Sequence, residues 1–75
     1  MNYTQDMTYA RIVSLYKAYL AITEIDAYHV GHLLNLERMA GMIQAYLECA
    51  YLPEDREQMR MKAYLEAYRM YTDWK

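Results

Sequence analysis

Apolar residues recur at intervals of three and four along most of the chain, with polar residues between them. This spacing collects apolar side chains on one side of an α-helix, because each residue advances about 100° around the helix axis. No segment shows the strict alternation and the β-branched enrichment that are typical of a strand. The pattern therefore predicts an all-α fold.

Local signals place the first two helices. Thr4 or Asp6 is expected to cap a first helix over about residues 7–22. The segment TEID, which begins at Thr23, matches the capping-box pattern, in which an acidic residue follows a threonine three positions later. After a short break, this signal predicts a second helix over about residues 24–51.

The third helix has a clearer start. Pro53 suits the first helical position, where an amide hydrogen is not needed, and Glu54 and Asp55 complement the positive end of the helix. A helix over about residues 53–73 follows. Since no Gly or Pro forces a break near residues 21–23, one unbroken helix over about 7–51 is the alternative. The fold is then either a small three-helix bundle or a long helical hairpin.

Each of the first two helices has one apolar face. On the first helix, the apolar residues within an arc of about 120° are Tyr9, Ile12, Val13, Tyr16, Tyr19 and Leu20. On the second, a seam with coiled-coil-like spacing consists of Leu33, Leu36, Ala40, Ile43, Leu47 and Ala50. These faces predict that the helices pack together around a shared core.

The third helix is apolar on two sides. Its solvent-facing charged stripe consists of Lys62, Glu66, Arg69 and Asp73. One flank carries Met61, Tyr64, Leu65, Tyr68 and Tyr71, and the other carries Met59, Ala63, Ala67, Met70 and Trp74. A bundle of this length covers one flank only, and the small Ala63 and Ala67 allow another helix to approach closely. We expect a homodimer or a protein partner there. The expected interface residues are Tyr64, Tyr68, Tyr71, Met70 and Trp74.

The size of the chain limits its core. A length of 75 residues corresponds to one domain with a small interior. Hydrophobic residues make up 56% of the chain, above the roughly 45–50% of an average soluble domain, so one small core hides only part of the apolar surface. The single cysteine, Cys49, cannot form an intrachain disulfide, which leaves a metal or association as the stabilising supplement. We expect oligomerisation to complete the fold.

Tyrosine is the dominant aromatic residue, with ten tyrosines, one tryptophan and no phenylalanine. Three of them lie in an Ala-Tyr-Leu cassette that begins at Ala18, Ala45 and Ala63, at spacings too uneven for a structural repeat. Tyrosine combines a large apolar ring with a hydroxyl that needs water or a polar partner. We therefore expect tyrosines at the core edges and in an oligomer interface, with a subset forming a recognition surface.

His29 and His32 are the residues closest to a metal-binding pattern. They lie three residues apart near the start of the second helix, and a symmetric dimer of such pairs would supply four ligands. No cysteine or carboxylate motif accompanies them, so they are weak metal candidates beside a pH-sensitive interface or a purely structural role. Cys49 is expected to be a half-buried structural thiol. No cofactor is expected.

The sequence lacks motifs for catalysis. It has no Gly-rich phosphate loop and no nucleophile elbow, and Ser14 is its only serine, so we expect no enzymatic activity. No apolar run is long enough for a membrane span and the N-terminus lacks the pattern of a signal peptide, so we expect a cytoplasmic location. A net charge of −2 and a pI near 5.5 disfavour binding to nucleic acid.

These features favour a small non-catalytic module that binds another protein, either as an adaptor or as an inhibitor that occludes a surface. By size class alone, the chain is also typical of phage and mobile-element products, among them inhibitors of host defence such as anti-CRISPR proteins. One alternative is an oligomeric helical protein that binds a small molecule or nucleotide on its tyrosine rings. The other is a helix-turn-helix DNA-binding regulator, which would need a basic recognition helix that the charge distribution does not supply. No motif resembles a known family.

Overall fold

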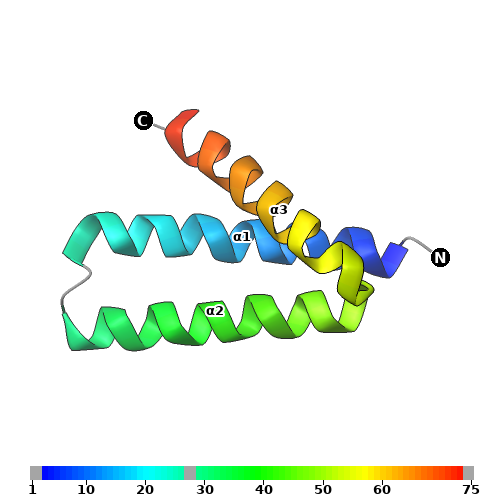
Figure 1. Cartoon of the computed structure of the whole chain (residues 1–75). Helices are drawn as coiled ribbons and strands as arrows, with labels where there is room; N and C mark the ends of the chain where they lie inside the picture. The colour runs from blue at the N-terminus through cyan, green and yellow to red at the C-terminus, as the bar shows by residue number, and fades with distance from the viewer. Residues whose placement is uncertain (1–2, 27–28, 74–75) are drawn as a thin grey trace.

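The computed structural model describes the backbone of residues 3–26 and 29–73 and the side chains of residues 7–24 and 29–73. Within these residues the chain forms three α-helices and no strand: α1 (Tyr3–Asp26), α2 (Val30–Ala50) and α3 (Pro53–Asp73). α1 and α2 lie side by side in antiparallel directions, and α3 crosses α1 obliquely (Figure 1). The prediction of an all-α three-helix bundle is confirmed.

The end of α1 lies later in the chain than the capping-box pattern predicted. α1 continues through Thr23 to Asp26, and Thr23 Oγ1 donates a 2.8 Å hydrogen bond to the backbone oxygen of Leu20. A threonine inside a helix can bond a carbonyl of the preceding turn, and this bond takes the place of the expected N-cap bond. The predicted break near residues 21–23 is therefore wrong.

The start of α1 also differs from the prediction. α1 begins at Tyr3, so that Thr4 and Asp6, the expected caps, lie inside the helix. Because α1 ends before α2 begins at Val30, the alternative of one unbroken helix over residues 7–51 is wrong as well.

His29 is the observed N-cap of α2. Its Nδ1 accepts a 3.2 Å hydrogen bond from Gly31 N, and its backbone oxygen accepts a 3.0 Å bond from Leu33 N. Gly31 leaves room for the imidazole, because a Cβ at this position would lie 3.3 Å from Nδ1 of His29. Histidine is not among the preferred capping residues, so the sequence pattern pointed to Thr23 instead.

Arg56 stabilises the connection between α2 and α3. Its Nε donates to the backbone oxygen of Tyr51 at 3.1 Å, and its Nη2 donates to that of Glu48 at 3.4 Å. These oxygens lie at the C-terminal end of α2, where a cation also interacts favourably with the helix dipole. α3 begins at Pro53 and ends at Asp73, as the sequence predicts.

One buried cluster joins the three helices. It consists of Ile12, Val13, Ile43, Leu47, Ala63 and Ala67, with Tyr9, Leu15, Tyr16, Leu20, Tyr46, Tyr51 and Met59 packed around it. The predicted faces of α1 and α2 supply most of this cluster. Leu33 and Ala40, which belong to the predicted seam of α2, are exposed instead, because α3 meets α2 at far fewer places than it meets α1.

α3 packs on α1 through its alanine flank. Ala63 and Ala67 are completely buried, and their small side chains let the two helices approach closely. The close approach that was expected from a partner helix on this flank is thus made by α1 of the same chain. The prediction of a partner on the alanine flank is wrong, and the opposite flank of α3 is the one that stays uncovered.

Glu66, which was expected to face solvent, turns toward α1. The Tyr9 hydroxyl donates a 2.5 Å hydrogen bond to Glu66 Oε2, and Lys62 Nζ lies 5.8 Å from the centre of the Tyr9 ring. Burial, followed by the bond to Glu66 and its negative charge, raises the pKa of Tyr9 to about 12. The phenol therefore keeps its proton, and the bond its donor, well above neutral pH.

Many large apolar side chains stay exposed. Among the described residues these are Met7, Val30, Leu33, Leu34, Met42, Leu52, Met61, Tyr64, Leu65, Tyr68 and Met70. Cys49 is exposed too, not half-buried as predicted, because it lies about 200° around α2 from the buried Leu47. The molecule thus has more apolar surface than its small core covers.

Candidate functional site

The outer side of α3 carries an exposed apolar strip that consists of Met61, Leu65 and Tyr68, which we name the α3 stripe. These residues are 58%, 61% and 50% exposed. Intervals of four and three place them on one side of the helix. Leu65 lies two positions from both Ala63 and Ala67, or about 200° around the helix, so Leu65 lies opposite the face of α3 that packs on α1.

Three tyrosine rings connect this stripe to α1. The ring centres of Tyr16 and Tyr64 are 5.4 Å apart with an interplanar angle of 83°, which is an edge-to-face contact. Tyr64 and Tyr68 are 6.4 Å apart with their rings tilted by 31°. Both distances lie in the range where aromatic pairs attract each other. The three rings hold one another in place and remain partly open to solvent.

A groove opens where the three helices meet, beside Tyr64. This tyrosine groove has a volume of about 500 Å³ and is lined by Tyr16, Tyr19, Ala40, Ile43, Gln44, Arg60 and Tyr64. A second hollow of about 370 Å³ adjoins it and is lined by Tyr16, Arg60, Met61, Tyr64 and Leu65. Because Tyr16, Arg60 and Tyr64 line both hollows, the surface is continuous from the groove to the α3 stripe.

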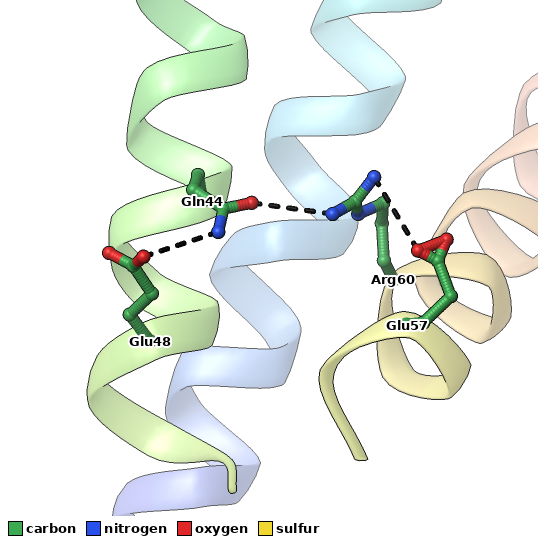
Figure 2. A network of polar contacts seen from close by, with 4 residues as sticks. All are labelled: Gln44, Glu48, Glu57 and Arg60. Carbon is green, nitrogen blue, oxygen red and sulfur yellow. Dashed lines mark hydrogen bonds and ion pairs between the residues drawn. The ribbon is translucent and has the colours of Figure 1, made fainter. Parts of the chain in front are cut away.

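Arg60 is positioned in the groove by a chain of polar contacts between α2 and α3 (Figure 2). Arg60 Nη2 donates to Gln44 Oε1 at 3.4 Å, and Arg60 Nη1 lies 3.6 Å from Glu57 Oε2. Gln44 Nε2 in turn donates to Glu48 Oε2 at 3.3 Å. The Arg60 side chain is still 43% exposed, so its guanidinium offers a charged donor at the groove wall.

Tyr16 is a hydrogen-bonding group, not a reactive one, near neutral pH. Burial raises the pKa of Tyr16, and the nearby Arg60 cation offsets part of this rise. The Tyr16 hydroxyl therefore stays protonated. The groove offers apolar ring faces, phenol hydroxyls and one guanidinium, a set suited to recognition.

The structure brings together only part of the interface expected from the sequence. Tyr64 and Tyr68 lie side by side, and Tyr71, seven residues after Tyr64, lies on the same side of α3 and is partly buried. Met70 lies about 200° around the helix from Tyr68 and belongs to a different surface. Trp74 lies outside the described residues.

Sequence reasoning missed the residues that α1 and α2 contribute to this surface. Tyr16 and Tyr19 were assigned to the core face of the first helix, but both are only partly buried and line the groove. Arg60 lies at the boundary between the two apolar flanks of α3, and the sequence pattern assigned it no role. Its position three residues after Glu57 and four before Tyr64 was the available signal for a charged group at an aromatic edge.

His29 and His32 lie at the far end of α2 from the corner with α3. Their ring centres are 5.2 Å apart, and Nδ1 of His29 is occupied by the capping bond from Gly31. Within residues 3–26 and 29–73, no group of three or more His, Cys, Asp or Glu side chains is placed to hold a metal ion. The N-cap role gives His29 a structural function that the sequence did not predict.

A second groove runs between α1 and α2 and has a volume of about 320 Å³. It is lined by Ala10, Arg11, Ser14, Leu15, Met42 and Tyr46, and the guanidinium carbon of Arg11 lies 6.0 Å from the centre of the Tyr46 ring.

In the described part of the chain, no helix combines the length and the apolar character that a membrane span needs. No protein-family model matches the chain, and no curated protein or solved structure is detectably similar to it.

Proposed function

We propose that this chain is a small cytoplasmic protein-binding module, an adaptor or an inhibitor, that holds its partner in the tyrosine groove. One observation supports this most. Three tyrosine rings and Arg60, fixed by Gln44, share one open groove that continues into an exposed apolar strip. Tyrosine and arginine are enriched among the residues that dominate binding energy, and rings already held in place lose little conformational entropy on binding.

The lining of the groove indicates the chemistry of the partner segment. Ile43 and the tyrosine rings favour an inserted apolar or aromatic side chain, and Arg60 favours a carboxylate next to it. A partner that presents both would cover the groove and displace its water. As an inhibitor, the module would act by occluding the surface from which this segment comes.

The same groove also favours a second candidate function, the binding of a small molecule. Its volume of about 500 Å³ lies within the range of about 300–1,000 Å³ that is typical of small-ligand sites. A flat molecule with an acidic group would contact the tyrosine rings and Arg60 together. Native mass spectrometry of gently purified protein would then show an added mass that the Arg60→Ala variant lacks.

Site-specific photocrosslinking in the source cells tests the proposed function. A photoreactive phenylalanine derivative replaces Tyr19 in the groove, and the matched control replaces Leu34, which is 58% exposed on the outer side of α2. We expect a discrete crosslinked protein from the groove position and none from the control. Crosslinks from both positions to the same proteins, or none from Tyr19, would contradict the proposal.

Binding of the crosslinked protein, once purified, gives the quantitative test. Because a central aromatic or arginine contact is worth at least about 2 kcal/mol, Tyr64→Ala and Arg60→Ala should each weaken binding about 30-fold in titration calorimetry. The control Leu34→Ala should leave the affinity unchanged. Unchanged affinity in both groove variants would place the partner on another surface.

A further inference from the structure

The spacing of the α3 stripe and of its flanking charges carries an inference about a second surface, which adjoins the tyrosine groove. Met61, Leu65 and Tyr68 occupy successive d, a and d positions of a heptad. Gln58 and Thr72 stand at the a positions on either side. We infer that this stripe pairs with α3 of a second copy of the chain, in parallel orientation, as a short two-stranded coiled coil.

The fold leaves the space that such pairing needs. The stripe lies on the side of α3 opposite Ala63 and Ala67, which are buried against α1. A second α3 can therefore approach the stripe from the outer side of α3, where Tyr16 of α1 borders the hollow beside Met61 and Leu65. Two copies would place their α1 and α2 helices on the outer sides of a central α3 pair.

The flanking side chains supply charge complementarity for the parallel orientation. In a parallel pair, each g position lies next to the following e position of the partner helix, five residues further along. Here Glu57, which also lies 3.6 Å from Arg60 Nη1 of its own chain, is at g and Lys62 is at the following e, so the two helices would form an ion pair in each direction. Tyr64 is at the next g and Arg69 at the next e, which gives a contact between a cation and an aromatic ring.

The antiparallel orientation lacks this complementarity. In that arrangement, e positions lie beside e positions of the partner, and both e residues, Lys62 and Arg69, are cations. The charges therefore favour one orientation of a second copy over the other. An unrelated apolar partner would gain the contact with the stripe but not this matched pattern of flanking residues.

Light scattering coupled to size-exclusion chromatography tests the pairing. Over chain concentrations from low micromolar to millimolar, we expect the mass to rise from the 9.0 kDa of one chain to twice that value. Leu65→Glu places a charge in the centre of the stripe and should abolish the rise. The matched control Leu34→Glu changes a leucine of similar exposure, 58% against 61%, and should leave it intact. Circular dichroism checks that both variants keep their helix content.

Disulfide trapping tests the orientation. In a Cys49→Ser background, Met61→Cys or Tyr68→Cys alone should form a disulfide-linked dimer under mild oxidation, because equal d positions meet in a parallel pair. A mixture of the Met61→Cys and Tyr68→Cys chains should form little of the mixed dimer. Failure of both single variants to form the linked dimer, in chains that still associate by light scattering, would overturn the parallel orientation.

Three further outcomes would overturn the pairing itself. These are a constant single-chain mass up to millimolar concentration, a dimer that survives Leu65→Glu, and a dimer that Leu34→Glu disrupts. The groove proposal has a separate readout, because Tyr19 and its crosslinks do not depend on Leu65. A monomer that still crosslinks through Tyr19 would refute the pairing and leave the proposed function standing.

Discussion

Tyr9 shows what a tyrosine at the core margin adds to a phenylalanine in the same place. Its ring packs against the buried cluster, and its hydroxyl reaches across to Glu66 on α3. A phenylalanine would fill the same space and leave the carboxylate of Glu66 facing an apolar ring edge. The absence of phenylalanine from the sequence thus fits a bundle in which many aromatic rings lie at the margin of the core. There the tyrosine hydroxyl can reach water or a polar partner.

The Tyr9 bond predicts a specific dependence of stability on pH. The pKa of Tyr9 is about 12 in the folded chain against an ordinary value of 10.0, so the folded state keeps a proton that the unfolded state releases in between. The stabilisation is complete below pH 10 and is lost as the pH rises through about 12. Below pH 10, Tyr9→Phe should lower the free energy of unfolding by about 1 kcal/mol.

Urea unfolding of the native chain and of Tyr9→Phe at a series of pH values checks this prediction. The difference between the two should shrink as the pH is raised from 10 toward 12. Glu66→Gln, which removes the charge beside the phenol, should move this window toward lower pH. A difference that stays constant over the whole range would show that Tyr9 does not titrate differently in the folded state.

The Ala-Tyr-Leu cassette shows, at the scale of the element, where sequence reasoning reaches its limit. On α2 the cassette buries Leu47 and exposes Ala45, whereas on α3 it exposes Leu65 and buries Ala63. The three residues and the helical backbone are the same in both cassettes, but the neighbouring helix packs on a different side of the cassette in α2 than in α3. Local pattern therefore predicts that both segments are helical, and tertiary packing decides which residue of each is covered.

The helical character of the three segments and most of the core residues of α1 and α2 follow from spacing alone, because α1 and α2 each have one apolar face. The ends of α1 and the start of α2 do not follow from it. Helix α3 has two apolar flanks, so the sequence could not decide which flank meets α1. The parts of the site that α1 and α2 contribute, Tyr16 and Tyr19 above all, depend on this choice. The His29 cap was missed for a different reason, since it depends on the space that Gly31 leaves beside the imidazole.

The crossing of α1 and α3 depends on the size of the alanines between them. Ala63→Leu adds a large side chain at a position with no exposed surface and should destabilise the fold by about 1–3 kcal/mol. Ala45→Leu makes the same change at the exposed alanine of the α2 cassette and should change stability by less than about 0.5 kcal/mol. Urea unfolding followed by circular dichroism compares the two. Equal effects would contradict the close packing of α3 on α1.

At the scale of the whole molecule, stability rests on few residues. A chain of 75 residues is expected to be stable by about 4–11 kcal/mol. Ile12 and Leu47 are its fully buried large side chains among the described residues, and Ile12 belongs to the cluster that all three helices share. Loss of packing at one such position therefore destabilises the entire bundle.

Ile12→Ala tests this dependence. It should cost about 2–5 kcal/mol, a large share of the total, and should markedly lower the melting temperature. Leu33→Ala, at a position that is 49% exposed, is the matched control and should leave the chain folded. Thermal unfolding followed by circular dichroism measures both. A similar melting temperature for the two variants would show that the shared cluster is not the main source of stability.

The central position of α1, which packs more extensively on each of the other two helices than they pack on each other, has a consequence for synthesis. The N-terminal part of a chain is made first, so α1 and α2 can form their hairpin while α3 is still being added. Until then, the side of α1 that carries Tyr9 and Tyr16 has no cover. The hairpin of a partly synthesised chain therefore leaves the α3-binding side of α1 exposed. Another helix with small residues at the spacing of Ala63 and Ala67 would compete with α3 for this surface.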